Sequence, residues 1–160
     1  MIFRFTKTSH AFRRFAQYEA LDMILGIGTD IVDIARIESA MNQYGEAFSR
    51  RIFTPVEQSY CEGYAHGKMA HYAARFAVKE AFSKAIGTGI AKGFAFKDIG
   101  VVNEKGGKPV IVLSGSMLEQ WGAYLIHVSI SHTDTIAMAV VIIESEHGTY
   151  PLDDLLENNQ

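Results

Sequence analysis

The sequence predicts a single domain of the α+β class, with a small and mainly antiparallel sheet packed against helices. Strand-like apolar runs occur near both ends of its central part, at 24–33 and 136–143, whereas helix-like patterns are grouped between them, in the range 34–86. Elements that are grouped by type, without a regular alternation of strand and helix, are typical of this class. The 160 residues are enough for one such domain and its core.

Residues 24–33 are expected to form a buried strand because they are apolar, β-branched and glycine-containing. Strand alternation places Gly26, Gly28 and Asp30 on one face. Asp30 is therefore an acid near the end of an apolar strand, where an unpaired carboxylate would be costly. It either pairs with a lysine or caps the next helix, or it binds a metal. The two glycines are not a dinucleotide-binding fingerprint, because the third glycine is absent.

Three helices are predicted in the first half of the chain. The first is stopped by Gly45. The second has a strong start signal, in which Thr54 is the N-cap, Pro55 takes the first helical position and Glu57 completes a capping box. The third ends at Gly87. The pair Gly87 and Gly89 is interpreted either as a C-terminal turn or as a donor of backbone N–H groups to a phosphate. The predicted ranges are 34–44, 55–64 and 69–86.

The second half of the chain is expected to hold two hairpins. The first surrounds a polar, glycine-rich loop, and the second has a short turn at 133–135. Between them, Ser114 or Ser116 can cap a short helix that runs through Trp121 and Gly122. In the third of the four strands, Ile130 faces the core and His132 shares its face at the end of the strand. The predicted strands are 99–102, 109–113, 126–132 and 136–143.

Charge is distributed unevenly along the chain. The formal net charge of −3 gives no electrostatic case for nucleic acid. Residues 1–22 hold four Lys or Arg against two acids, and residues 144–160 hold five acids and no Lys or Arg. We therefore divide the chain into an N-terminal extension at 1–22, a domain at 23–144 and an acidic tail at 145–160.

Cysteine usage and hydropathy bear on the location of the protein. The single cysteine, Cys61, cannot form an intramolecular disulfide, so cytoplasm is the default expectation. No run approaches the ~18 apolar residues that span a bilayer. The N-terminus has neither the continuous apolar core nor the cleavage site of a signal peptide.

The helix at 69–86 carries charges among small apolar residues. At about 100° per residue, Glu80 and Lys84 share a face with Ala73 and Ala77. One interpretation is an ordinary surface pair worth about 0.3 kcal/mol. The other is that the small neighbours let a ligand approach the two charges closely.

Three segments together resemble a known family. They are 26–32, with its Gly-x-Gly-x-Asp pattern, 75–90, with Arg-Phe-Ala-Val-Lys-Glu-Ala continuing to Lys-Ala-x-Gly-Thr-Gly, and 128–133, with Ser-x-Ser-His-Thr. In this order and spacing they resemble the holo-acyl-carrier-protein synthases, the short bacterial 4'-phosphopantetheinyl transferases. The resemblance covers essentially all of 23–144, and it implies the fold of that family.

The resemblance implies an enzyme that moves 4'-phosphopantetheine from coenzyme A onto a serine of apo-acyl carrier protein and releases adenosine 3',5'-bisphosphate. In the family, the acids that correspond to Asp30 and Glu80 hold Mg²⁺, and the lysine that corresponds to Lys84 contacts a coenzyme phosphate. These three residues form the implied catalytic set. The further coenzyme contacts implied are Arg75, Lys79, Gly87, His132 and Thr133.

The chemistry of the reaction calls for the same residue types. Attack of a hydroxyl on a diphosphate builds charge on oxygens that are already anionic, so catalysis consists mostly of charge neutralisation and alignment. Mg²⁺ is typically held by one or two carboxylates together with substrate phosphates. Asp30 and Glu80 are fifty residues apart and must be brought together by the fold. The serine proton goes either to Glu80 or to a metal-bound water.

The resemblance also implies a carrier-protein surface and an oligomer. Related enzymes meet their acidic carrier proteins with arginines near the first helix, which here are Arg36 and Arg51, with Phe48 as an apolar contact. Tyr44 and Ala47 stand where some relatives have further basic residues. Family members of this length are homotrimers with active sites between subunits. Two other interpretations remain open, a non-enzymatic module that binds coenzyme A or a carrier protein, and a structural domain whose acids form internal ion pairs.

Overall fold

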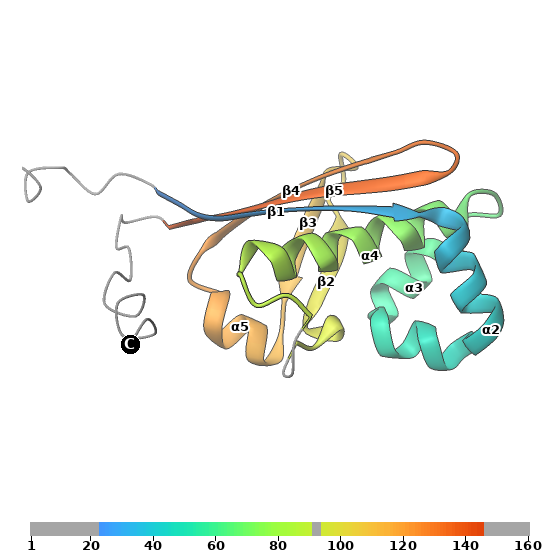
Figure 1. Cartoon of the computed structure of the whole chain (residues 1–160), viewed down its shortest axis with the longest axis horizontal. Coiled ribbons are helices and arrows are strands. Elements are labelled where there is room, and N and C mark those ends of the chain that lie inside the picture. The colour runs from blue at the N-terminus through green and yellow to red at the C-terminus, as the bar shows by residue number, and fades with distance from the viewer. Residues whose placement is uncertain (1–22, 91–93, 146–160) are drawn as a thin grey trace, which may run out of the picture.

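The structure of the protein is a computed structural model that describes residues 23–90 and 94–145, and it confirms the α+β class (Figure 1). The predicted extension at 1–22 and all but the first residue of the predicted tail lie outside the described residues. Within the described ranges, no helix has both the length and the apolar character needed to cross a membrane. The elements are β1 (Met23–Asp33), α2 (Ile34–Ile52), α3 (Pro55–Glu62), α4 (Lys68–Ala85), the short 3-10 helix η1 (Phe96–Asp98), β2 (Ile99–Asn103), β3 (Pro109–Leu113), α5 (Gly115–Trp121), β4 (Leu125–His132) and β5 (Ile136–Ser145).

The strands form two antiparallel sheets. The larger sheet has the order β1-β5-β4, and the smaller is the β2–β3 hairpin. Figure 1 shows the larger sheet almost edge-on, with α4 lying along one of its faces and the other face left open. Asp30 pairs with Ala139 of β5, which in turn pairs with Ile130 of β4. All three residues therefore point toward the helix side of the sheet.

The predicted alternation in β1 is confirmed, and it explains the two glycines. Gly28 is buried toward α4, whereas Ile27 and Ile31 on the opposite face are exposed. A Cβ atom on Gly28 would overlap the carbonyl oxygen of Ala81, and one on Gly26 would overlap that of Ala85. The strand thus lies directly against the backbone of α4, and only glycine allows this close approach.

The first helix continues beyond its predicted end. Gly45 interrupts α2 with φ 55° and ψ −135°, a backbone conformation that glycine adopts readily, but the helix resumes and ends only at Ile52. Gly45, which was predicted to stop the helix, therefore produces a kink within it. Ile34, Ile37 and Ile52 are buried along this helix.

The predicted capping box begins α3. Glu57 N–H donates to the Thr54 hydroxyl oxygen at 3.2 Å, and Thr54 N–H donates to Glu57 Oε2 at 2.7 Å. The helix ends at Glu62, two residues before the predicted end. Gly63 is its C-cap. The helix is short, so its N-terminus and the Glu57 side chain are fixed close to the next helix.

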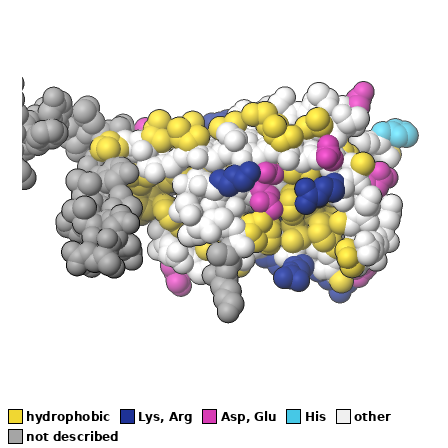
Figure 2. Space-filling view, in the orientation of Figure 1, with side chains coloured by type: hydrophobic (Ala, Val, Ile, Leu, Met, Phe, Trp, Pro, Cys, Tyr) yellow, Lys and Arg dark blue, Asp and Glu magenta, His cyan; other side chains and the backbone are white. Residues whose placement is uncertain are grey.

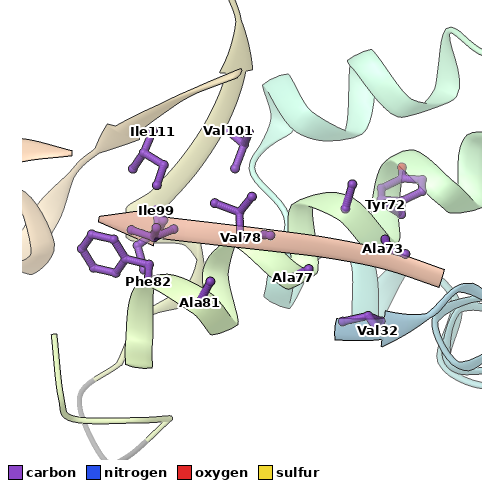
Figure 3. Close-up of a cluster of buried hydrophobic side chains, with 14 of the residues drawn as sticks. Val32, Tyr72, Ala73, Ala77, Val78, Ala81, Phe82, Ile99, Val101 and Ile111 are labelled. Carbon is purple, nitrogen blue, oxygen red and sulfur yellow. The ribbon is translucent and has the colours of Figure 1, made fainter. Parts of the chain in front are cut away.

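The core is organised around α4, which is buried between the larger sheet and the β2–β3 hairpin (Figure 3). Its alanines allow close packing on the sheet, and its larger apolar residues reach the hairpin. The side chains on the sheet side include Ala73, Ala77 and Ala81, and those near the hairpin include Val78, Phe82, Ile99, Val101 and Ile111.

Candidate active site

Asp30 of β1 and Glu80 of α4 are brought together by the fold. The pKa of Glu80 is raised above its ordinary value, first by partial burial and second by the negative charge of Asp30. Lys84 and Arg36 act in the opposite direction on the same carboxyl group. Figure 2 shows acidic side chains flanked by basic ones over α4. Four charged groups from β1, α2 and α4 therefore influence one another at this place.

The convergence follows from the way β1 crosses α4. Gly26 lies against Ala85 and Gly28 lies against Ala81, so the strand runs antiparallel to the helix. Two strand residues advance about 6.6 Å and one helical turn about 5.4 Å. Asp30, two residues after Gly28, therefore reaches the preceding turn of α4, on the side where Glu80 projects. The glycine spacing thus sets the position of the acid.

Lys84 is the direct partner of Asp30. Its Nζ donates to Asp30 Oδ1 at 2.8 Å and to the carbonyl oxygen of Thr29 at 2.9 Å. The expectation that Asp30 pairs with a lysine is therefore correct, whereas an ordinary Glu80–Lys84 surface pair is not what the structure shows. The Lys84 side chain is 49% exposed, so its ammonium remains accessible to a ligand beside the two acids.

The two acids fit a hard divalent cation. Mutual repulsion between Asp30 and Glu80 favours binding of a cation, because a cation would remove the repulsion that raises the Glu80 pKa. The described residues contain no cluster of three or more His, Cys, Asp or Glu suited to a metal. Mg²⁺ commonly binds two carboxylates, and water and phosphate oxygens occupy its remaining coordination positions.

A second group of polar side chains surrounds His132. Its ring lies 6.3 Å from that of His71, and the Arg75 guanidinium stacks over Tyr60 at 4.0 Å. Arg75 Nη2 donates to Asn103 Oδ1 at 2.8 Å, but Nε is buried without a partner. The pKa of His71 is lowered by burial first and then by the charges of Arg75 and His132. We name His71, Arg75 and His132 the histidine cluster. The positive charge of Arg75 suits an anion, and the sequence analysis did not select His71.

The histidine cluster and the acid pair lie on different sides of α4. Glu80 is nine residues after His71, which places it roughly 180° around the helix. The structure therefore does not unite His132 with Asp30 and Glu80 in one chain. Thr133, next to His132, lies in the β4–β5 turn, and its hydroxyl oxygen accepts from the N–H groups of Thr135 and Ile136.

Lys79 requires a correction. Its Nζ is fully buried and donates to Glu57 Oε2 at 3.0 Å, to the Phe96 carbonyl at 2.8 Å and to the Ile99 carbonyl. All three ammonium hydrogens are thereby used, so none is free for a coenzyme phosphate. Burial lowers the pKa of Lys79, and the charge of Glu57 opposes that shift. The prediction that this lysine contacts coenzyme A is wrong.

Gly87 forms a C-terminal turn of the kind that glycine favours. Its φ is 76°, and its N–H donates to the Lys84 carbonyl at 3.0 Å. The Gly89 N–H donates to the Ser83 carbonyl at the same distance. Both N–H groups are therefore engaged with the end of α4 and not with a phosphate. A coenzyme contact at Gly87 stays a prediction, and it would rest on the absence of a side chain.

The predicted carrier contacts lie along α2. A surface hollow of about 280 Å³ is lined by Tyr44, Ala47, Phe48 and Arg51. Tyr44 is 59% exposed, an unusual exposure for a large aromatic side chain. Arg36 is exposed in the first turn of the same helix, near Glu80. We name the four lining residues the α2 hollow.

Comparisons with known proteins identify the family of the chain. A family model described as the 4'-phosphopantetheinyl transferase superfamily matches residues 26–141. The holo-(acyl-carrier-protein) synthase of Rhizobium leguminosarum bv. trifolii is 46% identical over 130 residues, covering 77% of this chain and 96% of the relative.

Solved structures give the same result at the level of the fold. A holo-(acyl-carrier-protein) synthase from Bacillus anthracis in complex with coenzyme A (3',5'-ADP) matches with a TM-score of 0.67 and 40% identity, covering 78% of this chain and 99% of that one. The synthase from Helicobacter pylori in complex with coenzyme A matches with a TM-score of 0.66 and 37% identity, covering 73% and 98%. The chain therefore belongs to the holo-(acyl-carrier-protein) synthase family of 4'-phosphopantetheinyl transferases.

Proposed function

We propose that the protein transfers 4'-phosphopantetheine from coenzyme A to a serine of apo-acyl carrier protein, with Mg²⁺ held by Asp30 and Glu80, and releases adenosine 3',5'-bisphosphate. The observation that carries the proposal is the convergence of these two distant acids beside Lys84. Membership of an enzyme family argues against the two non-enzymatic interpretations of the sequence. A cytoplasmic location belongs to the proposal as well.

The chain's own residues account for the steps of the transfer. The serine oxygen forms a bond to the phosphorus next to the pantetheine, and the bond from that phosphorus to the bridging oxygen of the diphosphate breaks. The bridging oxygen leaves with the adenosine 3',5'-bisphosphate. Lys84 neutralises charge on this leaving group, and the Glu80 carboxylate is the acceptor that the chain offers for the serine proton. Bound Mg²⁺ would supply further positive charge at the diphosphate.

The active site is proposed to lie between subunits of a homotrimer. The acid pair and the histidine cluster face different sides of α4, so one coenzyme molecule reaches both only if a second chain supplies one of them. Ile27, Ile31 and Met138 are exposed on the open face of the larger sheet, and Figure 2 shows hydrophobic side chains along it. This apolar face provides the contact surface between copies. Arg75, His132 and Thr133 of one chain then serve the coenzyme that binds the acids of its neighbour.

The α2 hollow is proposed to bind the carrier protein. Arg51 and Arg36 supply positive charge for an acidic partner, while Phe48 and Tyr44 supply apolar contact. Charged contacts of this kind mainly speed association and make it sensitive to salt. The hollow has fewer basic residues than the resemblance suggests, so the salt dependence is expected to be moderate.

One assay tests the central proposal. Purified protein is incubated with coenzyme A, apo-acyl carrier protein and Mg²⁺, and the carrier is weighed by mass spectrometry. We expect the carrier to gain the mass of one phosphopantetheine group only when Mg²⁺ is present, and we expect the Glu80→Gln variant to give far less of the modified carrier. A carrier that gains no mass under any divalent cation would overturn the proposal.

A complementation experiment tests the shared site. Glu80→Gln and His132→Ala are each expected to be inactive or nearly so as pure proteins. Co-expression of the two variants gives mixed trimers, in which some interfaces combine the intact acid pair of one chain with the intact histidine cluster of another. Recovery of activity in the mixture supports a site between chains, and its absence in well-assembled mixed trimers contradicts it.

A further inference from the structure

Glu57 of α3 and Lys79 of α4 form a fully buried ion pair, and Lys79 directly precedes the proposed metal ligand Glu80 in the chain. The side chains of both residues are 0% exposed, and Lys79 Nζ lies 3.0 Å from Glu57 Oε2. Buried ion pairs are weak contributors to stability, because removing two charges from water offsets most of their attraction. The pair therefore calls for an explanation other than stability.

Each polar atom of the pair has a partner in a different segment. Glu57 Oε1 accepts the Val101 N–H of β2 at 3.1 Å, and Oε2 accepts the Thr54 N–H at 2.7 Å in addition to Lys79. Lys79 donates to the carbonyls of Phe96 in η1 and Ile99 in β2. Two side chains thus tie α4 to α3, η1 and β2, and every contact on the lysine is directional.

The pair lies on α4 immediately before Glu80. Successive helix residues differ by about 100° around the axis, so Lys79 is fixed toward α3 and β2 while Glu80 projects toward β1 and Asp30. A carboxylate roughly 6 Å from the helix axis would move about 2 Å if α4 rotated by ~20°. Metal–ligand distances deviate from their ideal values by only about 0.2 Å. The apolar contacts of α4, through alanines on the sheet side and through Val78 and Phe82 on the hairpin side, are not directional, whereas the hydrogen bonds of Lys79 fix one orientation of the helix.

We propose that Glu57 and Lys79 are positioning residues, which fix the rotation of α4 so that the Glu80 carboxylate faces Asp30 at the metal site. The inference rests on the proposed function, because it assumes that the two acids bind a divalent cation. It assigns a role to the motif lysine that does not involve the coenzyme, and it connects the capping residue of α3 to the geometry of the acids.

The test separates positioning from stability by removing the pair in two steps. Lys79→Met alone leaves the Glu57 carboxylate buried without its partner, so we expect a large fall in the urea midpoint. Glu57→Gln combined with Lys79→Met leaves no buried charge at this place. We expect the urea midpoint of this double variant to return most of the way to that of the unmodified chain. Mn²⁺ alone serves as the probe, with binding measured by electron spin resonance of the free ion.

If the pair positions Glu80, the double variant binds Mn²⁺ 10- to 100-fold more weakly than the unmodified chain despite its recovered stability. In the transfer assay kcat falls by a similar factor, while KM for coenzyme A changes little. The matched control is Lys68→Met, which removes an exposed ion pair with Glu62 from the start of α4 and is expected to leave Mn²⁺ affinity unchanged.

A double variant that is folded and binds Mn²⁺ with unchanged affinity overturns the inference. Should the double variant fail to fold, Glu57→Gln alone decides, because its amide oxygen can still accept from Lys79 and Thr54, while the charge and the hydrogen bond from the Val101 N–H are lost. Here weakened Mn²⁺ binding supports positioning, and unchanged binding contradicts it. If the unmodified chain binds Mn²⁺ but transfers nothing to the carrier, the proposed function fails while the positioning result still stands.

Discussion

Glu80 is held in an environment that disfavours its ionised form. Burial and Asp30 raise its pKa above the unfolded value. A carboxyl group with a raised folded pKa adds stability below the unfolded pKa, and that stability is lost as the pH rises through the folded pKa. At neutral pH the ionised side chain is therefore unfavourable for folding without a cation. Such a conflict between stability and function is expected of the proposed metal site.

We therefore expect Glu80→Gln to raise the melting temperature at pH 7 in the absence of divalent metal, while transfer activity falls on the order of 100-fold or more. Thermal unfolding over a pH series measures the first effect. The difference in melting temperature should shrink on acidification below the pKa of Glu80, where both side chains are neutral. A variant that is less stable than the parent at pH 7 would contradict the role of repulsion.

At the scale of elements, the contact between β1 and α4 controls the position of Asp30. A methyl group on Gly28 would overlap the Ala81 carbonyl, and the backbone on both sides leaves little room to adjust. We expect Gly28→Ala to lower the free energy of unfolding by about 3 kcal/mol, as measured by urea denaturation. Because the strand must move away from the helix, metal affinity should fall too. Gly106→Ala is the control, since a Cβ there meets nothing within 4 Å.

The helix α2 presents two adjacent arginines with different surroundings. Arg51 lines the α2 hollow, whereas Arg50 pairs with Glu46 at 2.5 Å. We expect Arg51→Ala to raise KM for the carrier protein about tenfold at low salt, with kcat nearly unchanged and a smaller effect at high salt. Arg50→Ala is the matched control and should change KM much less. Equal effects of the two substitutions would mean that the hollow does not define the docking surface.

At the scale of the whole molecule, the open face of the larger sheet is the proposed contact surface of the proposed trimer. Ile27 is 59% exposed on this face, and Val112 is 49% exposed on the β2–β3 hairpin. We expect Ile27→Arg to convert the trimer to monomers and to reduce transfer activity more than tenfold, because a charge in an apolar contact is costly. Val112→Arg should leave the trimer intact. Sedimentation velocity distinguishes the species, and an active Ile27→Arg monomer would refute the shared site.

Local sequence signals predicted the elements of this protein, and the resemblance to a family pointed to its two acids. The capping box of α3, the alternation in β1 and the helix pattern of α4 depend on neighbours in the chain, so they were predicted correctly. The kink at Gly45 was not predicted. A glycine at a positive φ either ends a helix or bends it, and the packing of the residues that follow decides between the two.

Only the tertiary structure decided the roles of the basic residues of α4. In the sequence, Arg75, Lys79 and Lys84 look equally suited to phosphates. In the fold, Lys79 forms a buried ion pair with Glu57, Arg75 stacks over Tyr60 within the histidine cluster, and Lys84 pairs with Asp30. The spacing of a helix fixes the angles between its side chains, but long-range packing fixes which element each side meets. That is why the acid pair could be named from the sequence, while its separation from His132 could not.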